Sequence, residues 1–206
     1  MRAVRRLRFN GRLLQASYAE MLRRAGRGRK TFEYMTHGDG DIVFAQRFHL
    51  SEADIDRVRL VCESGDCQDG PPPYRSTYYL WYEVASAMEG ATDVRITKNL
   101  IYMSFTRFTK DEAAGRSVLR GGGTLGGEYA ATVHGNALAV FPENLDEMQE
   151  RLFDRRRERD YGMNDIGSPG FEFWQAWAGS LGGAAHEIGH SFGLGHGDFS
   201  GERLLG

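Results

Sequence analysis

The chain has 206 residues, of which 41% are hydrophobic and 12% aromatic, a composition that allows a globular protein with a sizeable core. Its formal net charge of −2 argues against nucleic acid as a partner, and the lack of any apolar run of about 18 residues argues against a membrane span. Because the N-terminus also lacks the apolar core of a secretory signal, we expect a cytoplasmic protein, and the sequence leaves its oligomeric state open.

In the first half of the chain, apolar spacing and turn residues predict a mixture of helices and strands. The expected elements are a helix over 11–25 ended by Gly26, strands over 31–34 and 42–48 joined as a hairpin, a helix over 51–60 and a loop over 66–73. Cys62 and Cys67 could close a small disulfide loop or supply two corners of a metal site. Two free thiols are the preferred interpretation, because a four-cysteine zinc site would need two more cysteines.

The second half of the chain is predicted to alternate in the same way. The expected elements are a helix over 76–88, a strand over 100–105, a glycine-rich stretch over 119–127 that does not match a phosphate-binding loop, a hairpin of strands 129–133 and 137–141, and helices over 143–160 and 171–192 separated by a polar loop. Four glycines in the last helix indicate close packing against a sheet. Three histidines, His37, His49 and His134, stand singly, which is more typical of surface residues than of metal ligands.

The last predicted helix ends in the pattern H-E-x-x-H-x-x-G-x-x-H, formed by His186, Glu187, His190, Gly193 and His196. Residues four apart lie one turn apart on the same helix face, so His186 and His190 can aim their imidazoles at one metal ion. Gly193 permits the left-handed backbone that ends the helix, and the turn brings His196 back to complete a three-histidine site. The five fixed residues make a chance match rarer than roughly once in 10⁵ start positions.

Three histidines with one open position are the ligand set of a catalytic zinc site, so one Zn²⁺ is the expected cofactor. Zinc lowers the pKa of water toward neutrality and polarises a substrate carbonyl. Glu187 is the expected general base, which takes a proton from the water and passes it to the leaving amine. The predicted reaction is hydrolysis of an amide, with a peptide or protein as substrate. Asp198 could replace His196 as the third ligand, although the spacing favours His196.

The stretch from His186 to His196 resembles the zinc signature of the metzincin clan of metallopeptidases. More narrowly, the chain is similar to a family of zinc metallopeptidases known mainly from fungi, whose members carry the segment L-Q-x-x-x-A-E-x-M followed by G-R-R-T-F. The similar segments here run from Leu14 to Met21 and from Gly28 to Phe32, and the glycine pair Gly126-Gly127 followed by Phe141-Pro142 is also similar.

This resemblance implies an α+β, zincin-like fold in which a mixed sheet lies above an active-site helix. It implies the same three histidine ligands, with Glu187 as the base. It also places the hairpin of strands 129–133 and 137–141 at the edge of the sheet, where an extended substrate can add as a strand. The backbone expected to contact the substrate is that of Ala137, Leu138, Ala139 and Val140.

The chain departs from the clan in one respect. Metzincins have a methionine turn beneath the metal after the third histidine, and no Met follows His196 here. We therefore expect residues 1–206 to form one zincin-like domain whose C-terminal subdomain is missing or very short. Two alternatives stay open: a catalytically inactive zinc-binding relative that acts as a binding module, which the intact Glu187 argues against, and a zinc hydrolase of non-peptide amides.

Overall fold

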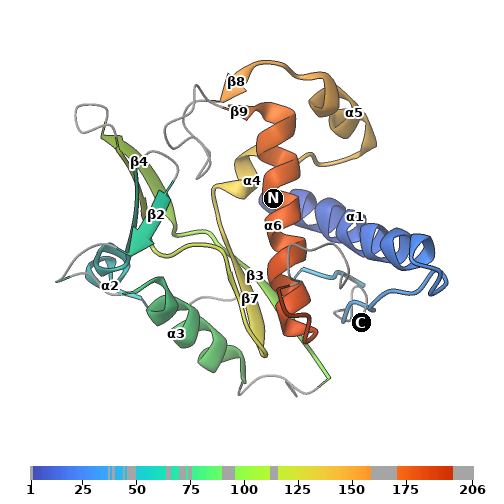
Figure 1. Ribbon diagram of the computed structural model, residues 1–206, viewed down its shortest axis with the longest axis horizontal. Coiled ribbons are helices and arrows are strands. Elements are labelled where there is room, and N and C mark those ends of the chain that lie inside the picture. Colours follow the sequence, from blue (N-terminus) through green and yellow to red (C-terminus); the bar gives the residue numbers. More distant parts are fainter. Residues whose placement is uncertain are drawn as a thin grey trace.

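The computed structural model describes residues 2–36, 38, 40–43, 45, 50–63, 66–69, 73, 76–89, 96–111, 116–158 and 171–196. Its helices are α1 (Arg2–Arg24), α2 (Glu52–Arg57), α3 (Thr77–Glu89), α4 (Ala137–Val140), α5 (Leu145–Phe153) and α6 (Phe173–Ser191). Its strands are β1 (Arg59–Glu63), β2 (Asp66–Asp69), β3 (Asn99–Met103), β4 (Arg107–Asp111), β5 (Arg116–Arg120), β6 (Leu125–Gly126), β7 (Ala130–His134), β8 (Arg157–Glu158) and β9 (Phe171–Glu172). Helix α6 runs through the middle of the molecule, with α1 on one side and strands on the other (Figure 1). The fold is therefore α+β, as predicted.

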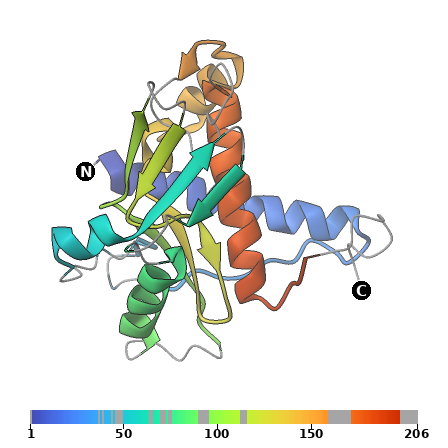
Figure 2. The same ribbon diagram turned by 60° about the vertical axis from the view of Figure 1, so that its left-hand side comes forward.

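The described strands form three sheets. The first is mixed and has the order β3-β7-β6, in which β3 pairs in parallel and β6 pairs antiparallel with the central β7. The second is antiparallel and has the order β2-β1-β5-β4; its strands lie side by side in Figure 2. The third pairs the short strands β8 and β9. The mixed sheet contacts α6 through all three of its strands, and β8 and β9 also contact this helix.

Strand β7 forms the centre of the core, because every one of its residues is buried. Successive side chains of a strand point to opposite faces of its sheet. Ala130 accordingly contacts Trp81 of α3 on one face, whereas Ala131 contacts Leu14 of α1 and Ile188 of α6 on the other. Helix α3 therefore covers one face of the mixed sheet, and α6 together with α1 covers the other.

The longer predicted helices are confirmed, with shifted ends. Helix α1 begins at Arg2 instead of residue 11, and its first turns are held by ion pairs from Arg2 and Arg5 to Glu143, at 3.0 and 2.6 Å. Helix α5 starts directly after Asn144, whose side chain accepts a hydrogen bond from the backbone amide of Glu147 at 2.9 Å. It ends at Phe153, well before the predicted residue 160.

The strand predicted over 31–34 and the loop predicted from residue 66 are wrong, whereas most of the strand predicted over 42–48 lies outside the described residues. Among the described residues between 31 and 48, none lies in a strand. Phe32 and Tyr34 lie against α1 instead: the side chain of Gln15 donates to the Phe32 carbonyl at 2.7 Å, and the Tyr34 hydroxyl donates to the Gly11 carbonyl at 2.8 Å. The first bond satisfies a backbone carbonyl that a hairpin would have paired, and the second fixes the Tyr34 side chain to the helix. The expected loop from residue 66 begins instead as strand β2, which pairs with β1.

The second predicted hairpin is also wrong, because its returning strand is the short helix α4. Both edges of β7 are already occupied by β3 and β6, so no position is left beside it for another strand. Ala137 and Val140, three residues apart, are each 1% exposed and pack against Ala176 and Trp177 of α6. The carbonyls of Leu138 and Ala139 accept hydrogen bonds from Arg6. The segment therefore offers no edge strand to a substrate.

The closest contact between α6 and the mixed sheet is made possible by Gly126 of strand β6 and not by the helix glycine Gly182. A Cβ at Gly126 of β6 would lie 2.2 Å from the carbonyl oxygen of Glu187, whereas a Cβ at Gly182 of α6 would meet nothing within 4 Å. Within the part of the chain that the structure describes, no helix is long and apolar enough to cross a membrane.

Candidate metal centre

The C-terminal half of α6 carries the first two candidate ligands, His186 and His190, one helical turn apart. The helix ends at Ser191 with Phe192 as its C-cap, and Gly193 follows with φ of 82°. The amide of Gly193 donates to the His190 carbonyl at 2.9 Å, and the amide of Leu194 donates to the Gly189 carbonyl at 3.0 Å. This pair of bonds is the Schellman ending, which requires a left-handed residue where Gly193 stands. The predicted turn at Gly193 is therefore confirmed.

This turn brings His196 back to the other two histidines. The Nε2 atom of His186 lies 3.1 Å from that of His190 and 3.1 Å from that of His196, and the remaining pair is 3.0 Å apart. The three nitrogens thus form a nearly equilateral triangle. Among the described residues, these three histidines are the group of His, Cys, Asp and Glu side chains whose donor atoms converge closely enough to hold a metal.

The dimensions of this triangle fit a metal ion. Its centre lies about 1.8 Å from each corner, which is less than the roughly 2.0–2.1 Å of a zinc–nitrogen bond, so one ion can reach all three nitrogens. Three ring nitrogens so close together cannot all be satisfied by hydrogen bonds to one another, because each neutral imidazole has only one N–H and one acceptor. The donor set therefore suits a divalent cation that prefers nitrogen ligands.

A hydrogen bond fixes the orientation of one candidate ligand. Nδ1 of His190 lies 2.8 Å from the carbonyl oxygen of Leu194, and a carbonyl can only accept, so Nδ1 carries the proton. The neutral ring then has its lone pair on Nε2, the atom that faces the other two histidines. Such an outer contact orients a metal ligand and raises its basicity. The turn after α6 thus both carries His196 and supplies the partner of His190.

Glu187 follows His186 on α6 and is partly buried. It is not among the three residues whose donor atoms converge, as expected for a carboxylate that acts beside the ligands. The backbone of Gly126 lies directly against the backbone of Glu187, with no room for a Cβ between them. One helical turn after Glu187, the Ser191 hydroxyl donates to the Gly127 carbonyl at 2.7 Å. Strand β6 is therefore fixed against the helix face next to the candidate metal ligands.

A surface hollow of about 510 Å³ adjoins this centre. Its lining comes from the end of α6, from the start of β3 and from the turn between β6 and β7, namely Ile96, Lys98, Glu128, His190, Ser191, Phe192 and Gly193. His190 therefore faces both the other histidines and an open space large enough for side chains of a bound molecule. The sequence did not predict that β6 and this hollow adjoin the candidate metal centre. The glycine pair Gly126-Gly127 was the local signal that a backbone approaches closely there.

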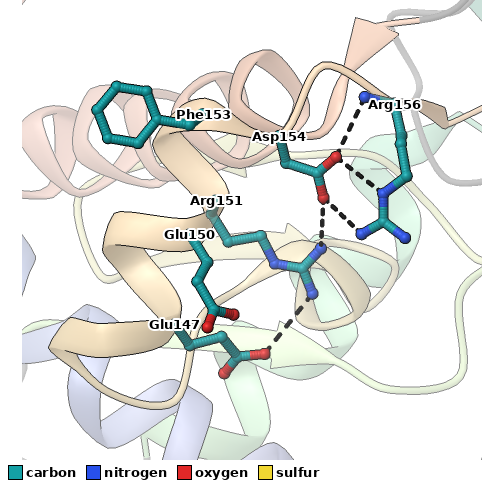
Figure 3. Close-up of a pocket in the computed structure, with 6 residues that line it drawn as sticks. All are labelled: Glu147, Glu150, Arg151, Phe153, Asp154 and Arg156. Atoms are coloured by element: carbon teal, nitrogen blue, oxygen red, sulfur yellow. Dashed lines mark hydrogen bonds and ion pairs between the residues drawn. The ribbon is translucent and has the colours of Figure 1, made fainter.

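A second hollow, of about 390 Å³, lies at α5 (Figure 3). Helix α5 lies beside the start of α6 in Figure 1, whereas the three histidines lie at and beyond the end of that helix. Its charges pair with one another: Arg151 contacts Glu147 and Asp154, and Arg156 contacts Asp154 at 2.6 Å. The guanidinium of Arg156 lowers the pKa of the Asp154 carboxyl below its usual value. None of the described residues that line this hollow is a histidine, cysteine or serine, and it lies away from the three histidines, so it is not the candidate metal centre.

The other residues that the sequence singled out are either placed away from the centre or not among the described residues. His37, His49 and Asp198 lie outside the described residues, as do the side chains of Cys62 and Cys67, whose backbones face each other across β1 and β2. The expectation that His134 is a surface residue is wrong, because it ends the central strand β7 and is 6% exposed. The residues Ala137, Leu138, Ala139 and Val140 pack on the first turns of α6, away from the histidines.

Comparisons with known proteins agree with a metal-dependent peptidase. No curated protein and no solved structure matches the chain. The family model Metallopep, described as "Putative peptidase family", matches residues 1–200, nearly the whole sequence. The chain therefore belongs to this family of metallopeptidases.

Proposed function

We propose that this metallopeptidase is a zinc enzyme that hydrolyses peptide bonds, with His186, His190 and His196 as the zinc ligands and Glu187 as the general base. The observation that carries the proposal is the triangle of three Nε2 atoms 3.0–3.1 Å apart. Three imidazoles and an open fourth position are typical of catalytic zinc. A zincin-like fold is proposed on the same grounds, because a mixed sheet lies directly against the helix that carries the ligands.

The residues around the centre have separate tasks. Bound zinc supplies Lewis acidity, which makes water more acidic and polarises the scissile carbonyl. Glu187, held in place by the contact of its backbone with Gly126, accepts the proton of the attacking water and delivers it to the leaving amine. The Leu194 carbonyl keeps His190 in the tautomer that leaves Nε2 free to bind metal.

A substrate strand is best accommodated by β6 in place of the segment predicted from sequence. Strand β6 is an edge of the mixed sheet and touches the ligand helix at Glu187. An extended peptide that pairs with this edge would run past the histidines, and its side chains could enter the 510 Å³ hollow beside His190. The substrate-binding role of residues Ala137 to Val140 is replaced in this proposal by Leu125 and Gly126.

The proposal is tested by zinc content and peptide cleavage in the same preparations. We expect one zinc per wild-type chain by mass spectrometry, and loss of that zinc in His190→Ala. We expect Glu187→Gln to keep the zinc but to lose peptide cleavage by a factor of about 10²–10⁴, the usual contribution of a general base. His134→Gln, at a histidine outside the centre, is the control for zinc content.

The other outcomes identify the alternatives. Zinc without cleavage of any member of a peptide library would indicate an inactive relative or a hydrolase of non-peptide amides, and cleavage of small acylated amines would then separate these two. If the wild-type protein, refolded with excess zinc, retains none after gel filtration, the three-histidine zinc site is wrong.

A further inference from the structure

The segment of residues 31–34, here named the aromatic strap, lies against the turn that follows α6. The ring centroid of Phe32 is 5.4 Å from that of Phe192 and 5.6 Å from that of Tyr18, and the rings of Tyr18 and Phe192 are 6.1 Å apart. The three rings come from the strap, from the end of α6 and from α1. They form one cluster, in which Tyr18 meets both phenylalanines edge-to-face and the rings of Phe32 and Phe192 are tilted by 33° to each other. Such aromatic contacts stabilise beyond the area they bury.

Polar contacts hold the strap on α1. The Gln15 amide donates to the Phe32 carbonyl at 2.7 Å, and the Thr31 hydroxyl donates to the Gln15 carbonyl at 3.0 Å. On the other side of Phe32, the Tyr34 hydroxyl donates to the Gly11 carbonyl at 2.8 Å. The backbone on both sides of Phe32 is therefore fixed to one helix, which fixes the direction in which its ring points.

Helix α1 is in turn fixed to α6 at the level of the metal ligands. The Tyr18 hydroxyl donates to the carbonyl of Ala185, the residue before His186, at 2.6 Å. A Cβ at Gly189 would lie 3.3 Å from the same hydroxyl oxygen, so the glycine leaves the space that Tyr18 uses. Leu14 of α1 is buried against Ile188. The strap is thereby held in a defined position relative to His186 and His190.

The turn that carries His196 has little packing of its own. Residues 192–196 are all exposed, and Leu194 is 57% exposed. Phe192 joins this turn to the cluster, and its exposed fraction of 41% is compatible with one ring face against the cluster and one toward the hollow beside His190. Beyond Phe192, the Leu194 side chain lies near Gly189, and backbone hydrogen bonds to α6 and the contact of His190 with the Leu194 carbonyl hold the turn. The position of the Phe192 ring therefore contributes to where Leu194 and His196 are placed.

We propose that Phe32 is a positioning residue for the third metal ligand: through Phe192 it holds the turn that carries His196 and the Leu194 carbonyl. This inference rests on the proposed function, because it requires His196 to bind metal. It gives a role to the sequence segments that contain Gln15, Thr31 and Phe32. These segments are far from the histidines in sequence, and the structure brings them beneath the candidate metal centre.

The test is the affinity of the full chain for Zn²⁺, measured by competition with a chromogenic chelator. We expect Phe32→Ala to weaken zinc binding by about tenfold or more, the usual effect of losing an outer contact of a metal ligand. Phe32→Leu keeps apolar volume and should weaken it less. Met148→Ala removes a partly buried side chain that packs near the opposite end of α6, so it should lower stability while leaving zinc affinity unchanged.

A double-mutant cycle shows whether Phe32 acts through His196. In a His196→Ala background, adding Phe32→Ala should weaken zinc binding no further, because the ligand that Phe32 positions is already gone. A purely structural role would lower zinc affinity by the same factor in both backgrounds. If Phe32→Ala does not fold, Phe32→Leu and Gln15→Met carry the same test.

Loss of the positioning role and loss of the zinc site would give different results. If the wild type binds one zinc and the folded Phe32 variants bind it equally tightly, the positioning role is overturned and the zinc site stands. If the wild type binds no zinc, or His190→Ala binds it as well as the wild type, the proposed function itself is overturned.

Discussion

Gly126 lets strand β6 touch α6 at the backbone of Glu187, because any Cβ at this position would lie 2.2 Å from the Glu187 carbonyl oxygen. Gly126→Ala must push β6 away from the helix or shift α6 itself. We expect it to lower the free energy of unfolding by about 1–3 kcal/mol, the usual cost of overpacking. Peptide cleavage by the folded fraction should also fall, since the edge strand and the base would be displaced. Chemical denaturation and cleavage assays measure these two effects.

Gly182→Ala on α6 is the matched control for this substitution. Gly182 is exposed, and a Cβ there would meet nothing within 4 Å. Alanine is favoured over glycine in a helix by up to about 1 kcal/mol, so this variant should be equal to or more stable than the wild type. If Gly126→Ala were as stable as Gly182→Ala, the close contact between β6 and α6 would be wrong.

At the scale of elements, Asn10 joins α1 to α6 and to the chain after α4. It is 1% exposed; its side-chain oxygen accepts from the Trp177 indole at 3.0 Å, and its amide donates to the Pro142 carbonyl at 2.8 Å. Asn10→Leu keeps the volume but leaves both partners buried and unpaired. Each such group costs about 1–3 kcal/mol, so we expect a loss of roughly 2–5 kcal/mol in the free energy of unfolding.

Two comparisons make this prediction specific. Arg12→Leu, an exposed position on the same helix, should change stability by no more than about 0.5 kcal/mol. Trp177 is nine residues before His186, roughly 14 Å along the helix, so the folded Asn10→Leu protein should keep the zinc affinity of the wild type. A stability equal to that of Arg12→Leu would mean that the buried hydrogen bonds of Asn10 contribute nothing net.

The elements that sequence predicted well are those whose signal is local. Helices α1, α3 and α6 repeat apolar residues at helical spacing, and the ligand residues of the candidate centre fall within eleven positions, so no long-range contact was needed to place them. The segment Ala137 to Val140 was mispredicted because four apolar residues fit a strand or a helix equally well. The choice between them is decided by tertiary structure, because β3 and β6 already occupy both edges of β7.

At the scale of the whole molecule, the largest surprises come from contacts between distant parts of the sequence. The contact of Phe32 with Phe192 joins residues that no local spacing relates. The β2-β1-β5-β4 sheet has charged residues in every strand, so neither apolar alternation nor composition predicted β4 and β5. The three histidines and Glu187 could therefore be predicted from the sequence, whereas the aromatic contacts and the sheets that surround them could not.

Acid should destabilise the whole fold through His134. This histidine is 6% exposed, and burial lowers its pKa to about 4. In the unfolded chain its pKa returns to about 6.5, so between these two values the unfolded state binds a proton that the folded state does not. The free energy of unfolding should therefore fall as pH falls through this window, by on the order of 3 kcal/mol in total from this residue.

The measurement is the free energy of unfolding of the metal-free protein, in chelator, from pH 7 to pH 4, for the wild type and His134→Gln. Glutamine cannot take up the proton, so the curve of His134→Gln should be flatter, and every other residue is common to the two proteins. Arginine neighbours lower the pKa of the Glu143 and Asp154 carboxyls below their unfolded values. The stability that these two carboxyls contribute is therefore lost only as pH falls below their unfolded pKa values, under most of the His134 window, and it is lost equally in both proteins. Parallel curves for the two proteins would show that His134 is not held neutral in the core.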